Sequence, residues 1–249
     1  NKRRQPTAVE RKQIIAWVKT VTDRWDSGSQ GRDPGRTTIR RLNKNEYNYT
    51  VRDLFGYQVR PADDFPEDGG GEAGFDNNAD ALFLPPLLME NYVEAAGLMV
   101  HNVYRNQALY TKYLFTFPAG EVKPVDAARK VLRNWAAKAY RRPVEESEVE
   151  RLVKIFQLGM EKKKQDYRAA MKLPLLAMLI SPNFLYRAEK IRPGNEVYRV
   201  DDFDLASRLS YFIWSSMPDA ELFKLASEGR LSDPGILKAQ VERMLKDEK

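Results

Sequence analysis

Seven carboxylates fall within residues 61–80, a stretch that contains no lysine or arginine. Like charges held this close together repel one another unless a cation or basic side chains compensate them. Asp76, Asn78 and Asp80 match the first three ligand positions of a calcium loop of the form D-x-[DN]-x-[DN]. Ala81 and Leu87 then stand where that loop requires a glycine and a glutamate, which excludes an EF-hand.

Three explanations of this acidic stretch therefore remain open. The first is a looser oxygen cage for Ca²⁺, with further ligands from three other carboxylates of the loop, Asp63, Asp64 and Asp68. The second is ion pairing with arginines that precede the loop in sequence, Arg36, Arg40 and Arg41. The third needs no ligand, because Asp, Asn and Gly are the residues that turns and helix caps use.

The remaining candidates for metal or acid–base chemistry are isolated. His101 is the only histidine and the chain has no cysteine, which excludes disulfides, Cys-based zinc sites and covalent haem attachment within these residues. With no second ligand beside it, His101 is expected to be structural or on the surface. The adjacent pairs Asp63–Asp64 and Asp201–Asp202 do not show two carboxylates facing one cleft, as a glycosidase requires.

Two polar clusters have both a binding and a structural explanation. Arg141 and Arg142 would suit a bidentate grip on a phosphate or carboxylate, but they also suit the negative C-terminal end of the preceding helix, which we favour. The amides and tyrosines of residues 43–50 would suit sugar hydroxyls. Asn43 is better explained as a helix cap and Tyr47 as a core residue.

The net charge of +6 is unevenly spread, with +8 in residues 1–60, −7 in residues 61–80 and +5 in residues 81–249. The basic residues are scattered through helical patterns and form no dense stripe, so we expect no nucleic-acid partner. No apolar run is long enough for a transmembrane segment, and no signal-peptide pattern is present. The chain opens without Met and its last pattern runs to Lys249, so we expect further chain on both sides.

Helical periodicity and capping residues dominate the rest of the chain. We expect a mainly α protein, a bundle-like array of about nine helices with one long acidic loop, residues 57–83. Cap pairs mark several starts, among them Thr7 with Glu10 and Asn43 with Glu46. Pro174 should kink or divide the helix predicted for residues 166–180. Strand is expected only in short pieces near 113–117 and 196–200.

Several long motifs resemble a family of large planctomycete proteins. They are RLNKNEYNYTVRDLFG (41–56), PADDFP (61–66), GFDNN (74–78), AYRRPV (139–144), SPNFLYR (181–187) and LASRLSYFIWSSMPD (205–219). The resemblance places a first module of the unknown-function type 1587 at 37–123, a second of type 1595 at 124–195, and the start of a third, of type 1592, at 196–249. Residues 27–36 would be a linker.

In that family such modules usually follow a cytochrome c domain, and residues 1–26 resemble its closing helix. The resemblance implies haem c upstream, further modules downstream, and an extracytoplasmic (periplasmic or secreted) location. We therefore expect no cofactor held in this chain apart from Ca²⁺, and a non-catalytic scaffold or docking module that serves electron transfer or an attached oxidation. The alternative is a carbohydrate-binding or catalytic domain for polysaccharide processing, with its site in the 57–83 loop. The family offers no catalytic residues to transfer.

Overall fold

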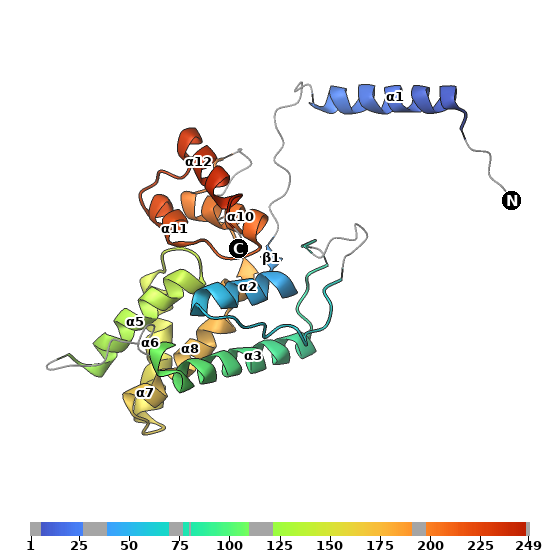
Figure 1. The fold of residues 1–249 in the computed structure, drawn as a ribbon. Coiled ribbons are helices and arrows are strands. Elements are labelled where there is room, and N and C mark those ends of the chain that lie inside the picture. Colours follow the sequence, from blue (N-terminus) through green and yellow to red (C-terminus); the bar gives the residue numbers. More distant parts are fainter. Residues whose placement is uncertain are drawn as a thin grey trace. The chain divides into compact units, whose positions relative to one another are not determined.

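The computed structural model describes residues 6–26, 39–69, 77–79, 81–109, 122–190 and 198–247. Within that part of the chain, nine helices have at least seven residues, and the only sheet has two strands (Figure 1). The prediction of a mainly α protein with about nine helices is therefore confirmed. The chain divides into a small unit, Asn1–Thr37 with Pro193–Tyr198, and a main unit, Thr38–Arg192 with Arg199–Lys249.

The small unit contains α1 (Ala8–Asp26). Its predicted capping box is present, because the Thr7 backbone N–H donates to Glu10 Oε2 at 2.7 Å and the Glu10 N–H donates to Thr7 Oγ1 at 3.3 Å. The apolar side chains of α1 are exposed: Ile14 by 52%, Trp17 by 67% and Val18 by 45%. This helix therefore presents an apolar face that it does not bury by itself.

The first module of the main unit contains α2 (Lys44–Phe55) and α3 (Pro86–Arg105). Asn43 caps α2 through a complete capping box with Glu46, as predicted. Gly56 ends α2 in the left-handed conformation, with φ of 67°, where a residue without Cβ carries little strain. Pro86 opens α3 at a position where its missing N–H costs no helical hydrogen bond.

The second module is a set of five helices. They are α5 (Pro124–Ala139), α6 (Glu146–Glu161), α7 (Tyr167–Ala170), α8 (Lys172–Leu179) and α9 (Pro182–Leu185). The predicted division by Pro174 is confirmed, since α7 ends at Ala170 and α8 begins within the turn before the proline. α5 packs along α6, and α8 packs against α3, α5 and α6.

The third module contains α10 (Asp202–Trp214), α11 (Ala220–Ser227) and α12 (Pro234–Met244). An aspartate caps each of these helices by accepting backbone N–H groups of the first turn: Asp201, Asp219 and Asp233. Both α11 and α12 pack on α10. The cap predicted at Asp201 is confirmed.

The strands lie where the sequence did not place them. β1 (Arg40–Arg41) pairs antiparallel with β2 (Tyr186–Arg187). Residues 198–200 have no helix or strand, and residues 113–117 and 196–197 lie outside the described residues. Two-residue strands leave no periodicity in a sequence, because pairing this short depends on the rest of the fold to bring the segments together.

Two apolar cores stabilise the main unit. The larger core combines side chains of the first and second modules, such as Tyr47, Tyr92, Phe156 and Phe184, all at most 1% exposed. The smaller core lies within the third module and includes Trp214, Leu222 and Met244. No helix among the described residues has the length and apolar character needed to cross a membrane.

Candidate functional site

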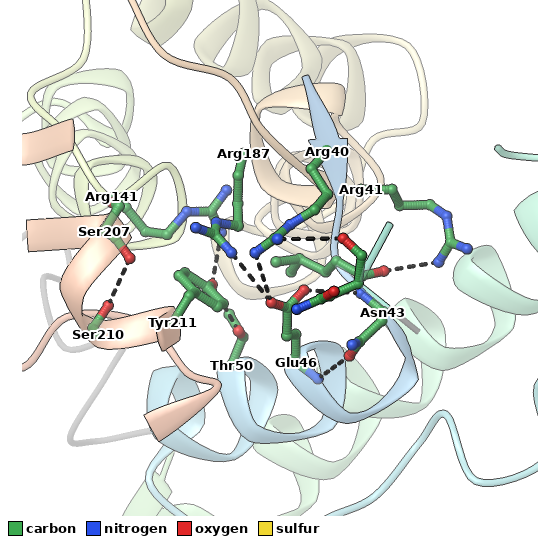
Figure 2. Close-up of polar contacts among 12 residues, drawn as sticks. Arg40, Arg41, Asn43, Glu46, Thr50, Arg141, Arg187, Ser207, Ser210 and Tyr211 are labelled. Carbon is green, nitrogen blue, oxygen red and sulfur yellow. Dashed lines mark hydrogen bonds and ion pairs between the residues drawn. The ribbon is translucent and has the colours of Figure 1, made fainter. Parts of the chain in front are cut away.

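The first two residues of the site come from the β1–β2 pair. Arg40 and Arg187 lie opposite each other in the strand register, and both guanidinium groups reach the same carboxylate oxygen, Glu46 Oε1, each at 3.2 Å (Figure 2). Glu46 is the residue of α2 that completes the capping box, and its Oε2 accepts the Asn43 N–H at 3.1 Å. One carboxylate that is 5% exposed thus caps a helix and ties it to a residue 141 positions later.

Tyr211 of α10 joins all three modules (Figure 2). Its hydroxyl lies 2.8 Å from Thr50 Oγ1 in the first module and accepts from Arg141 Nη1 in the second module at 3.3 Å. The Arg187 guanidinium lies over the Tyr211 ring, 4.5 Å from its centroid. Tyr211 is 3% exposed, so these contacts are shielded from water and correspondingly strong.

The prediction that Arg141 complements the C-terminal end of the preceding helix is wrong. It follows α5 with a left-handed φ of 59°, a conformation that is costly for a residue with a Cβ. Its Nη2 lies 3.0, 3.1 and 2.8 Å from the carbonyl oxygens of Asn183, Phe184 and Tyr186. The Arg141 side chain therefore complements the C-terminal end of α9 and not the end of the preceding helix.

Arg142 has a carboxylate partner instead. Its two terminal nitrogens donate to the two oxygens of Glu148, both at 2.9 Å, and the guanidinium lowers the pKa of this glutamate. Glu148 also accepts from Asn183 Nδ2 at 2.9 Å. The second arginine of the predicted pair is thus held within the second module.

The third module makes one more polar contact with the first. Ser216 Oγ donates to Asp53 Oδ2 at 2.7 Å, and Arg52 Nε donates to Asp53 Oδ1 at 2.7 Å. Ser216 is fully buried. We refer to the seven residues that link the modules in this way as the junction: Glu46, Thr50, Asp53, Arg141, Arg187, Tyr211 and Ser216.

Part of the acidic loop pairs with the basic residues before it. Arg41 Nη2 donates to Asp68 Oδ1 at 2.5 Å, and the Lys44 N–H donates to Asp68 Oδ2 at 2.6 Å. The side chains of this pair are 3% and 7% exposed. The ion-pair explanation therefore holds for Arg41, whereas Arg40 pairs with Glu46 and reaches the loop through the carbonyl oxygen of Asn77.

The other predicted calcium ligands are divided among different places. Asp63 accepts from Asn48 and Arg60, and Asp64 is exposed. Asn78 is half-buried, and Asp76, Asp80 and Arg36 lie outside the described residues. No group of three carboxylates or histidines in the described ranges is arranged to hold a metal. The calcium site stays a prediction for the loop as a whole.

The remaining candidates have structural positions. His101 is exposed on α3, as expected for a surface residue, and Asn43 and Tyr47 are the predicted cap and core residue. Asp201 caps α10, while Asp202 Oδ2 accepts the Leu231 N–H at 2.7 Å. The two adjacent carboxylates thus have separate structural partners, one at the start of α10 and one in the loop between α11 and α12.

Asp204 is a titratable group that the sequence did not single out. Burial raises its pKa to about 6, with further increases from Asp201 and Glu189. It accepts the Lys190 N–H at 3.1 Å and lines a cavity of about 650 Å³ between the second module and α10. Its position in the first turn of a helix gives no sequence sign of this burial, since Asp is common there as an exposed residue.

Tyr211, Thr50 and Arg187 are residues of the junction that sequence reasoning missed. Arg187 and Tyr211 fall inside the quoted motifs SPNFLYR and LASRLSYFIWSSMPD, and Thr50 falls inside the first motif. The motifs were therefore the available indication, but a single sequence does not show which residues of different motifs meet.

Comparison with known families matches three parts of the chain in series. Residues 40–105 match PSD3, Protein of unknown function (DUF1587), residues 127–189 match PSD5, Protein of unknown function (DUF1595), and residues 200–249 match PSD4, Protein of unknown function (DUF1592). No curated protein and no solved structure matches the chain. The chain thus carries three successive modules from families of unknown function, and each of the three contributes side chains to the junction.

Proposed function

We propose that this chain is a non-catalytic helical scaffold that holds three modules in a fixed arrangement for an attached redox domain. The observation that supports this most directly is the Tyr211 hydroxyl, which bonds to Thr50 of the first module and Arg141 of the second. Buried polar contacts are directional, so they fix how two surfaces meet more strictly than apolar contacts do.

The contacts of the junction residues fit a structural role better than a catalytic one. Glu46 is engaged by Arg40, Arg187 and the Asn43 N–H, and Asp53 by Arg52 and Ser216. A general base must instead be able to reach a substrate proton. Arg141 directs its donors at helix carbonyls and a tyrosine hydroxyl. These groups stabilise one another, which is the role expected of a scaffold.

The redox part of the proposal draws on the family resemblance and on α1. The resemblance implies an upstream cytochrome c domain, an extracytoplasmic location and a role in electron transfer or an attached oxidation. The exposed apolar side chains Ile14, Trp17 and Val18 would then form the surface on which the haem domain packs. On this proposal haem belongs to the upstream domain, and further modules of the same chain are the other partners.

A double-mutant cycle on the 249-residue chain tests the scaffold. Thr50→Val and Tyr211→Phe each remove one side of the 2.8 Å hydroxyl pair without creating a large cavity. We expect a coupling energy of about 1 kcal/mol in urea unfolding, because a buried neutral hydrogen bond has that net strength. Thr20→Val on the exposed face of α1, combined with Tyr211→Phe, is the matched control and should be additive. A coupling energy near zero for the first pair would count against the junction.

Hydrogen exchange tests the redox part separately. In a longer protein that carries the upstream haem domain, the amides of α1 should exchange more slowly than in the 249-residue chain, because the apolar face is covered. Trp17→Ser should remove this protection and leave the exchange of α3 unchanged. Equal exchange of α1 in both proteins would reject the proposed packing without affecting the scaffold.

A further inference from the structure

A cavity of about 640 Å³ opens beside the junction, between the first and third modules, and its two walls differ in chemistry. The polar wall comes from the β strands, the start of α2 and the end of the acidic loop: Arg40, Asn45, Glu46, Asn77 and Arg187. The apolar wall comes from α10 and α12: Leu205, Leu209, Phe212, Leu237 and Val241. Binding sites for small organic molecules are typically concave, of about 300–1,000 Å³, and apolar with a few placed polar groups, and this cavity has those features.

The polar wall carries more positive than negative charge. Arg40 and Arg187 share the single oxygen Oε1 of Glu46, so one of the two positive charges has no carboxylate of its own. A third lining arginine, Arg208, is already held by both oxygens of Glu189, each at 2.5 Å. The excess charge of the wall is therefore centred on Arg40 and Arg187.

Arg187 is the less compensated member of this pair. Its side chain is 14% exposed, and its buried Nε has no hydrogen-bond partner among the described residues. Burial, together with the charges of Arg40 and Arg141, lowers the pKa of Arg187, although Glu46 partly opposes this. A buried guanidinium in such surroundings would be stabilised by an additional anion.

The apolar wall restricts which anion fits. Leu205, Leu209 and Phe212 are spaced at four and three residues, so they share one face of α10. Phe212 lines the cavity and is 87% exposed, whereas most phenylalanine side chains are buried. Inorganic phosphate has no apolar part to pack on this wall, and binding beside it would remove some of the water that solvates the anion.

We propose that this cavity binds a small organic carboxylate, with the carboxylate on Arg187 and Arg40 and the apolar body on the α10–α12 wall. Guanidinium and carboxylate form the shorter and stronger class of hydrogen bonds, so the arginines fix the orientation of the ligand. The apolar body contributes by burying Phe212 and its leucine neighbours. This inference goes beyond the scaffold function: Glu46, Arg187 and Tyr211 line the cavity and also belong to the junction, but the double-mutant cycle is measured without ligand and the cavity is tested by ligand binding.

Ligand-observed NMR on the 249-residue chain tests this with three probes. They are 3-phenylpropionate, its neutral counterpart 3-phenylpropanamide, and inorganic phosphate. We expect 3-phenylpropionate to bind at least tenfold more tightly than the amide, because only the carboxylate pairs with the arginines. Equal binding of the amide, equal or tighter binding of phosphate, or no binding of 3-phenylpropionate would each overturn the proposal.

Two variants locate the binding. Arg187→Gln should weaken 3-phenylpropionate binding about thirtyfold, the loss expected when a buried charge-assisted contact is removed. Phe212→Ser should weaken it about tenfold through lost apolar contact, and its exposure makes it harmless to the fold. Leu245→Ser, on a residue that is 69% exposed and outside the cavity lining, is the matched control and should bind as the wild type does. If Phe212→Ser also binds as the wild type does, the cavity is not the binding site.

Discussion

The first two modules meet through apolar side chains, whereas the third meets them largely through polar ones. Tyr47 of the first module and Phe184 of the second pack with ring centroids 6.0 Å apart, and Phe55 and Trp135 pack at 5.2 Å. The third module has a core of its own and contributes Tyr211 and Met217 to the larger one. The first two families therefore share one apolar core, whereas the third family has a smaller core of its own within the same compact unit.

The difference has an energetic consequence. Apolar burial is lost in proportion to the area exposed, so the first two modules cannot separate without opening their common core. Each polar contact of the junction contributes only about 1 kcal/mol net, or up to about 3 kcal/mol where a charge is involved. The third module should therefore separate at a lower free energy than the core of the other two.

The largest effect is expected from the shared core. Phe184→Ala should lower the free energy of unfolding by about 3–5 kcal/mol, because it removes a fully buried ring and leaves a cavity. Since Phe184 belongs to the same core as α3 and α8, which also pack on each other, these two helices should lose stability together in urea unfolding followed by hydrogen exchange. Phe212→Ala, on an exposed ring, is the matched control and should change stability by less than about 0.5 kcal/mol. If α8 loses stability and α3 does not, the first two modules do not share one core.

An intermediate effect is expected from the junction. Arg141→Met should cost about 3 kcal/mol, because it leaves the carbonyl oxygens at the end of α9 without their buried donor. The substitution keeps a Cβ at the left-handed position, so the backbone strain is the same in both proteins. Arg151→Met, on an exposed arginine of α6, is the control for the lost charge. Equal stability of the two variants would show that the junction contributes little.

The smallest effect is expected from Asp204, at the boundary between the second and third modules. Its pKa of about 6 in the folded state lies above the ordinary aspartate pKa of 3.8, so folding favours the protonated form. The corresponding stability is present below about pH 4 and is lost as the pH rises towards 6. Asp204→Asn should therefore stabilise the chain at pH 8 by less than about 1 kcal/mol, a value reduced for solvent screening.

Thermal melts at two pH values measure this. The melting temperature of Asp204→Asn should exceed that of the wild type at pH 8, and the two should coincide near pH 4, where the wild-type aspartate is protonated. The Lys190 N–H still has an amide oxygen to bond in the variant, so the change isolates the charge. A stabilisation of equal size at both pH values would show that the charge of Asp204 is not the cause.

The local parts of this fold were predictable from the sequence. The Asn43–Glu46 cap, the proline start of α3 and the division at Pro174 each depend on neighbours within four residues, so a single sequence contains the whole cause. The composition of the acidic loop also indicated that its charges need partners, and Arg41 with Asp68 provides one such pair.

The junction was not predictable because its partners are far apart in sequence. Nothing near Glu46 indicates that it pairs with Arg187, and nothing near Thr50 indicates Tyr211, which lies 161 positions later. Arg141 shows a second reason. Arg141 was correctly assigned to a helix end, but its guanidinium bonds to carbonyl oxygens of α9, a helix more than 40 positions later in the chain.

Native-state hydrogen exchange on the 249-residue chain, with and without Tyr211→Phe, tests whether the first two modules open together and the third opens separately. We expect amides of α3 and α8 to exchange through one common opening, with the same free energy and the same dependence on urea. We expect α11 and α12 to open at a lower free energy, and Tyr211→Phe to lower only this second value, by about 1 kcal/mol. Separate openings for α3 and α8 would contradict the shared core of the first two modules. An α11 that opens only together with them in both proteins would contradict the separate opening of the third module.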